Sequence, residues 1–163
     1  MNTYKIEIKY GLIFVVMSLL WILLEKMTGL HSESIHLHTT YTNFIAIPAT
    51  AIYVFALLEK RKKDLQGSMT WLQGFKSGMI ISLVVMVLSP ITQMITFWLI
   101  TPEFFPNVIK YAVNSRYMTQ AEAENYFTLS NYMVQGLIGA PIMGAFTSAL
   151  VAIFIMKKPV STV

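Results

Sequence analysis

Apolar residues along this chain gather in long runs that no charged residue interrupts. Three such runs occupy residues 39–58, 77–102 and 125–156, and each exceeds the roughly 18 residues that indicate a membrane-spanning helix. A shorter run at residues 10–24 becomes long enough when the flanking lysines extend towards the membrane interface. The pattern predicts four transmembrane helices, at about residues 8–28, 41–58, 75–100 and 132–156.

The first helix has a competing interpretation, a cleaved signal peptide with Lys5 and Lys9 ahead of an apolar stretch. No small-x-small cleavage site follows this stretch, so we expect a retained helix. A β-barrel is not expected, because the apolar runs are continuous rather than alternating. The sequence therefore predicts an all-α integral membrane protein with a single membrane domain over residues 1–163.

Composition supports the same class. Hydrophobic residues make up 55% of the chain and charged residues 12%, about half the charged share of an average soluble domain. Neither a soluble globular fold nor disorder is expected at this apolar content. The chain has no cysteine, which excludes disulfides, thiolate metal sites and thiol nucleophiles. The net charge of +4 does not by itself indicate nucleic-acid binding. In a membrane protein, what matters is on which side of the bilayer the basic residues lie.

The basic residues are distributed unevenly between the two sides of the predicted membrane. One side holds both termini and the connection between the second and third spans, and it carries nine of the 12: Lys5, Lys9, Lys60, Arg61, Lys62, Lys63, Lys76, Lys157 and Lys158. Because cytoplasmic segments carry the excess of lysine and arginine, both termini are expected to be cytoplasmic. The cluster at residues 60–63 is expected to anchor this face, and it can also hold anionic lipid headgroups.

Several segments resemble a known bacterial family. Residues 67–78 read GSMTWLQGFKSG after the basic cluster, residues 101–104 read TPEF after the third span, and residues 9–13 read KYGLI. Together they resemble the family called domain of unknown function 4199, over nearly the whole chain. The resemblance implies a small four-span inner-membrane protein of the kind common in Bacteroidota. It implies no activity and no functional residues, because the family has no established activity.

Three histidines, His31, His36 and His38, lie with Glu33 in the short connection between the first two spans. On an extended segment, a His-x-His pair places two imidazoles on one face, a spacing that suits zinc or copper. A third ligand with fixed geometry is not evident, so a polar loop that happens to contain histidines is favoured. No metal site and no cofactor are assigned from the sequence, and metal binding by the histidines is left open.

The central part of each span contains no Asp, Glu, Lys, Arg or His. The strongest polar group is in the third span, where Ser89, Gln93 and Thr96 share one helical face. These residues can line a substrate path, but hydrogen bonding between helices and repair of the kink at Pro90 is favoured. The chain has no nucleophile–base pair, phosphate-binding loop or usable carboxylate pair, so neither catalytic residues nor enzymatic activity are expected.

The connection at residues 101–131 is long and carries helix signals. Phe104 and Phe105 before Pro106 suit a helix start, and Thr119 with Glu122 forms a capping box. A short interfacial helix or helices are expected there, with a docking surface for a membrane or periplasmic protein as the sharper alternative. The expected function is a non-enzymatic scaffold or accessory subunit. The alternative is a small transporter or channel-like protein that uses the polar face of the third span.

Small residues recur at every fourth position in the last two spans. The rows are Gly136, Ala140, Gly144, Ser148 and Ala152 in the fourth span, and Gly74, Gly78 and Ser82 in the third. Such rows let helices approach closely, so we predict that they face each other, with Leu137, Ile138 and Phe146 turned elsewhere. A homodimer through the same row is the alternative. The similar starts of the first and third spans, residues 9–13 and 76–80, also leave open a duplicated helical hairpin.

Overall fold

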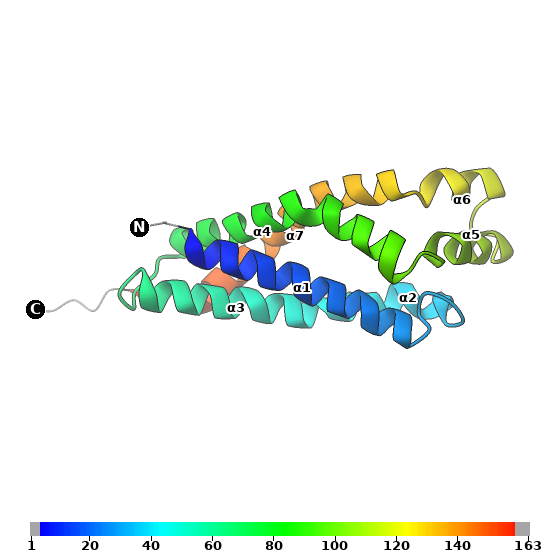
Figure 1. Cartoon of the computed structure of the whole chain (residues 1–163). Helices are drawn as coiled ribbons and strands as arrows, with labels where there is room; N and C mark the ends of the chain where they lie inside the picture. Colours follow the sequence, from blue (N-terminus) through cyan, green and yellow to red (C-terminus); the bar gives the residue numbers. More distant parts are fainter. Residues whose placement is uncertain (1–3, 159–163) are drawn as a thin grey trace, which may run out of the picture.

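The computed structural model describes residues 4–158 as a bundle of long helices that lie side by side (Figure 1). Four helical stretches are long and apolar enough to cross a membrane: Lys5–Met27, Ile35–Lys63, Trp71–Ile100 and Leu129–Ile155. The predicted all-α class with four membrane-length helices is confirmed. The second stretch is longer than the predicted span at both ends, because helical structure already begins at Ile35 in the connection.

Several of these stretches are divided into shorter elements. In chain order the elements are α1 (Lys5–Met27), α2 (Ile35–Tyr41), the 3₁₀ turn η1 (Thr42–Ile45), α3 (Ala46–Lys63), α4 (Trp71–Met94), the π-helical turn η2 (Ile95–Ile100), α5 (Phe104–Asn114), α6 (Gln120–Tyr126) and α7 (Leu129–Ile155). Helices α5 and α6 occupy the connection in which short helices were predicted.

The bundle has two distinct ends. Both ends of the described chain and the connection between α3 and α4 lie at one of them, which we call the terminal end (Figure 1). There, backbone hydrogen bonds of 2.9 and 2.8 Å join Met69 to Lys157, just after α7. The opposite end carries α2 and the pair formed by α5 and α6, and we call it the hairpin end (Figure 1).

Local hydrogen bonds fix where two of the helices begin. At the start of α4, the Thr70 hydroxyl accepts a bond from the Gln73 backbone N–H, and the Gln73 side chain accepts one from the Thr70 N–H. The predicted capping box of Thr119 and Glu122 starts α6 in the same way. The backbone N–H and hydroxyl of Thr119 stabilise the Glu122 carboxylate and hold its pKa below the ordinary value.

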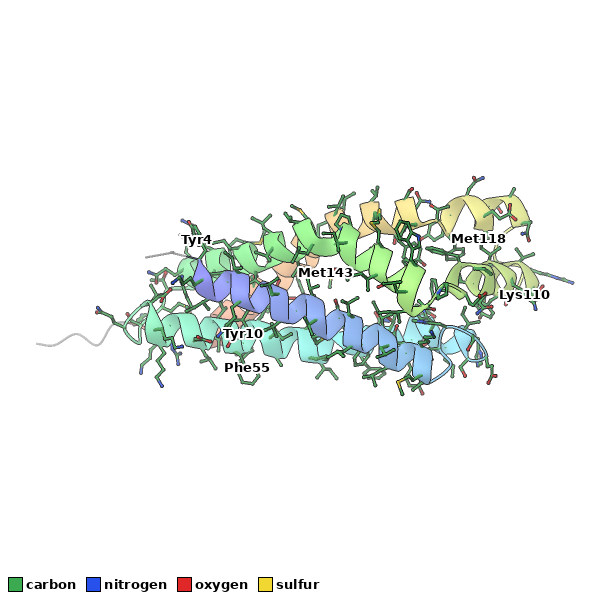
Figure 2. The ribbon with its side chains drawn as sticks, viewed as in Figure 1. Tyr4, Tyr10, Phe55, Lys110, Met118 and Met143 are labelled. Carbon is green, nitrogen blue, oxygen red and sulfur yellow. The ribbon has the colours of Figure 1, made fainter. Side chains whose placement is uncertain are left out.

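The protein buries a small core and leaves much apolar surface outside. Buried hydrophobic residues cluster where α3, α4 and α7 meet towards the terminal end: Tyr53, Ala56, Leu57, Met69, Ile81, Val151, Ala152 and Ile155. By contrast, Phe55 points away from the bundle (Figure 2), and Phe154 is 83% exposed. Large outward-facing apolar side chains along all four long helices are what a lipid environment requires.

The end of α4 is wound more widely than an α-helix. Residues 95–100 form the π-helical turn η2, and the Thr101 N–H donates to the Thr96 carbonyl, five residues back, at 2.7 Å. Such turns are rare and occur most often at functional sites. Here the turn leads directly into α5, whose first residue, Phe104, is buried at the hairpin end.

Candidate functional site

A buried carboxylate meets two imidazoles at the hairpin end. Glu25 lies in the last turn of α1, His31 in the connection that follows, and His38 in α2. Glu25 Oε2 is 3.1 Å from His31 Nε2 and 3.7 Å from His38 Nε2. Glu25 is only 4% exposed and His31 only 5%. We call these three residues the Glu-His-His cluster, and their ligand-type atoms all lie within 4.8 Å of one another.

Neighbouring side chains hold the cluster in place. The Trp21 indole N–H donates to Glu25 Oε1 at 2.6 Å, which leaves the other carboxylate oxygen turned to the histidines. The Phe104 ring lies 5.1 Å from the His31 ring and 5.2 Å from the His38 ring, measured between centroids. Asn107 donates from Nδ2 to the His31 carbonyl at 2.8 Å. Helices α1, α2 and α5 therefore all contribute to the cluster or its walls.

A largely apolar cavity of about 480 Å³ lies beside the cluster, where α1 meets α2 and η1. Its lining includes Trp21, Leu24, Leu37 and Phe44, and Glu25 is its acidic residue. The carboxylate thus has the histidines on one side and an apolar cavity on another. This combination offers room for a small ligand next to a charged group.

The cluster differs from the histidine group that the sequence indicated. Glu33 and His36 are exposed and lie outside the cluster. The extended backbone that would place His36 and His38 on one face is not present, because residues 35–41 form α2, and residues two apart on a helix face different directions. Glu25, which directly follows the apolar run at residues 10–24, was not singled out from the sequence. The signal that could have revealed it is an acidic residue in the last turn of a span, six residues before a histidine.

The predicted polar face of the third span is only partly brought together. Ser89 and Gln93 line a cleft of about 270 Å³ between α1, α4 and α7, where Gln135 of α7 also lies. Thr96 does not line this cleft and lies at the start of the π-helical turn. Thr96 is buried instead, and its hydroxyl has no partner within residues 4–158.

The structure places the two rows of small residues against each other. Built on the glycines, a Cβ at Gly74 would lie 3.0 Å from the Ala152 Cβ, and one at Gly136 would lie 3.2 Å from the Ser89 hydroxyl. Between these points, Gly78 lies against Ser148 and Gly144 against Ser82. Ala140 lines two clefts beside this interface. The larger Leu137, Ile138 and Phe146 are exposed.

At the terminal end, much of the basic cluster contacts the protein itself. Lys60 Nζ lies 2.9 Å from Glu7 Oε1 and 2.8 Å from Asp64 Oδ2. Arg61 Nη1 donates to the Ile155 carbonyl at 2.7 Å. Lys62 and Lys63 are exposed, with Lys63 Nζ 2.9 Å from Glu59 Oε1. The members best placed to meet lipid headgroups are therefore Lys62 and Lys63.

Glu7 is the second acidic residue that the sequence did not single out. It is 1% exposed, and the Ser77 hydroxyl of α4 donates to its Oε1 at 2.8 Å, on the oxygen that also pairs with Lys60. Glu7 Oε2 is buried without a hydrogen-bond partner in the described part of the chain. Helices α1, α3 and α4 are thereby joined through one buried carboxylate.

One protein-family model matches this chain. The family model described as "Protein of unknown function (DUF4199)" matches residues 9–157, which include all four membrane-length helices nearly in full. No curated protein and no solved structure matches the chain. The matched range contains the Glu-His-His cluster, the small-residue rows and residues 60–63. Because one family model accounts for nearly the whole sequence, the chain belongs to the DUF4199 family.

Proposed function

We propose that the protein is a non-enzymatic scaffold or accessory subunit that binds a second protein through its hairpin end. The observation that carries this proposal is the pair formed by α5 and α6, which stands beyond the ends of the long helices (Figure 1). Long ordered connections outside a bundle are common places for binding. Lys110 extends outward from α5 and Met118 lies between α5 and α6 (Figure 2).

The surface of this helix pair has the chemistry of a protein-binding surface. Tyr117 is 73% exposed and Tyr126 is 48% exposed, and both border a groove that Glu122, Asn125 and Asn131 also line. Tyrosine is enriched in protein interfaces because its ring buries apolar area while its hydroxyl keeps a hydrogen bond. The groove therefore suits a partner surface that combines apolar side chains with amide or hydroxyl groups.

The polar residues inside the long helices support a structural role for the bundle. The Ser89 hydroxyl donates to the Met86 carbonyl at 2.9 Å, and the Thr92 hydroxyl to the Leu88 carbonyl at 3.0 Å. Ser148 bonds the Gly144 carbonyl of its own helix at 2.5 Å. Hydroxyls bonded to their own backbone have less capacity to bind a passing solute.

A photo-crosslinking amino acid placed at position 117 or 126 tests this proposal in intact cells. We expect one discrete adduct with a second protein from each position, because both side chains face outward beside the groove. The matched control is position 154, where Phe154 of α7 is more exposed but lies on the apolar surface. Equal adducts from position 154, or none from 117 and 126, would contradict the proposal.

A small transporter is the second candidate, and the cleft with Gln93 and Gln135 favours it. Two amide side chains in a cleft between three helices offer donors and acceptors to a polar solute. Gln93→Leu combined with Ser89→Ala removes one of these amides and the neighbouring hydroxyl, with little change in side-chain bulk, and leaves Gln135 in place. If folded protein with both changes no longer mediates solute flux in liposomes that wild-type protein supports, transport replaces the accessory role.

The membrane orientation is part of the proposal. The excess of lysine and arginine at the terminal end supports a cytoplasmic location for that end in a bacterial inner membrane. The cysteine-free chain allows a direct test with single cysteines at Ser68 and Ser115. With an impermeant thiol reagent that has passed any outer membrane, we expect position 115 to be labelled and position 68 to be protected until the cells are opened. The reverse pattern would invert the orientation.

A further inference from the structure

We propose that Glu25, His31 and His38 form a binding site for one divalent transition-metal ion, with Zn²⁺ as the best-suited species. The three side chains come from α1, the following connection and α2, and they meet with their ligand-type atoms within 4.8 Å. Two imidazoles and one carboxylate are a common ligand set for zinc. This site is independent of the partner-binding role proposed above.

The distances within the cluster are close to those that a bound ion needs. Zinc binds imidazole nitrogen and carboxylate oxygen at about 2.0–2.2 Å, so two ligands in a tetrahedral site lie about 3.3–3.5 Å apart. Glu25 Oε2 already lies 3.1 Å from His31 Nε2 and 3.7 Å from His38 Nε2. The third separation, between the two histidines, lies within 4.8 Å, so an ion needs side-chain shifts that draw the imidazoles closer together.

The charge balance of the cluster favours a cation. Among residues 4–158, Glu25 pairs with these two imidazoles and with no lysine or arginine. The adjacent Lys26 turns its ammonium to the Ile100 carbonyl instead. A carboxylate that is 4% exposed is costly to bury unless a positive charge compensates for it. A divalent ion between the carboxylate and two neutral imidazoles supplies that charge.

The surroundings of His31 argue against a purely structural histidine. Its Nδ1 is buried and has no hydrogen-bond partner in the described part of the chain. Buried polar side-chain atoms normally have a partner, and the contact between Nε2 and the Glu25 carboxylate satisfies only one of the two ring nitrogens. The ring is nonetheless held against Phe104, and Asn107 anchors the His31 backbone to α5. The structure thus keeps an incompletely bonded imidazole next to a carboxylate.

A hydrogen bond holds the carboxylate in position, and the cluster can be reached from outside. The Trp21 indole fixes the carboxylate by binding Oε1, as outer partners commonly do for metal-binding groups. The His38 side chain is 21% exposed, so an ion can reach the cluster from outside. Three protein ligands leave a fourth position for water or another ligand.

Zinc titration of the whole chain, purified in detergent without a polyhistidine tag and freed of metal by a chelator, tests the site. We expect one Zn²⁺ per chain by calorimetry and by elemental analysis. His38→Ala is expected to weaken binding by at least about 100-fold, since losing an outer partner of a metal ligand already costs 10–100-fold. Mg²⁺, which prefers oxygen ligands, is not expected to compete.

Matched controls lie on the same helix and in the same connection. His36→Ala removes an exposed histidine two residues from His38, and Glu33→Gln removes an exposed carboxylate two residues from His31. Both variants should bind zinc as the wild type does. Glu25→Gln keeps the side-chain shape and an acceptor for Trp21, so it separates lost metal binding from lost folding, which circular dichroism monitors.

Co²⁺ provides a second readout that does not depend on affinity alone. A four-coordinate site with nitrogen and oxygen ligands gives Co²⁺ visible absorption, which we expect to appear in wild-type protein and to disappear on adding Zn²⁺. Folded Glu25→Gln and His38→Ala proteins should lack this absorption. Zinc binding that is unchanged in His38→Ala, or no stoichiometric binding by the wild type, would overturn the proposal and leave a carboxylate that contacts two histidines without a metal.

Discussion

Replacing Gly144 with leucine is expected to force α4 and α7 apart and to lower the free energy of unfolding by about 3 kcal/mol or more. A Cβ built on Gly144 overlaps the Ser82 Cβ and lies 3.1 Å from the Tyr53 hydroxyl oxygen. Ser82 and Tyr53 are themselves buried, and the cleft of about 90 Å³ beside them does not relieve the overlap, because the Ser82 Cβ moves only with its backbone. The new atoms must therefore displace a whole helix.

The matched control is Gly139→Leu on the same helix, because a Cβ at Gly139 meets nothing within 4 Å. This control should cost less than about 1 kcal/mol, close to the ordinary effect of a surface substitution. Unfolding in mixed micelles measures both values, and light scattering reports the oligomeric state. Equal losses for the two variants would show that the small-residue row is not a packing interface. Loss of a dimer at unchanged stability would instead assign the row to a homodimer.

Lys60→Met is expected to lower the free energy of unfolding by about 3–5 kcal/mol. The substitution leaves Glu7 buried at 1% exposure without its cation, while the apolar part of the side chain is kept. Removing one partner of a buried ion pair is costly because the remaining charge is no longer compensated. Helices α1, α3 and α4 meet at this pair, so the damage extends to all three.

Unfolding of a set of four proteins measures this effect. Lys62→Met, at an exposed lysine two residues further on, should change stability by less than about 0.5 kcal/mol. The double variant Glu7→Gln with Lys60→Met should be more stable than Lys60→Met alone, because no buried charge is left. A double variant no more stable than the single one would mean that Lys60 acts through other contacts.

The four spans could be predicted from the sequence because membrane crossing depends on composition over about 20 residues. The close packing of α4 on α7 could also be predicted from the sequence. Small residues four positions apart lie on one face of a helix, and Gly78 in α4 and Gly144 in α7 belong to such rows. Both inferences use one helix at a time and need no knowledge of how distant segments meet.

The Glu-His-His cluster could not be predicted in the same way. His38 lies in α2, a short helix that has no strong signal in the sequence. The orientation of this helix determines that His38 and not His36 meets Glu25. Glu7 and Lys60 likewise meet only after α1 and α3 have packed together. Charged residues near span ends look like ordinary flanks in a sequence, and burial alone distinguishes them.

The π-helical turn at residues 95–100 changes the direction in which the side chains that follow it point. Each residue of an α-helix turns the chain by about 100°, and the wide turn accommodates one residue more than an α-helical turn would. Deleting one residue there would leave the third span long and apolar, yet it would swing Phe104 and Asn107 away from His31. One extra residue at the end of α4 therefore sets the direction in which α5 faces.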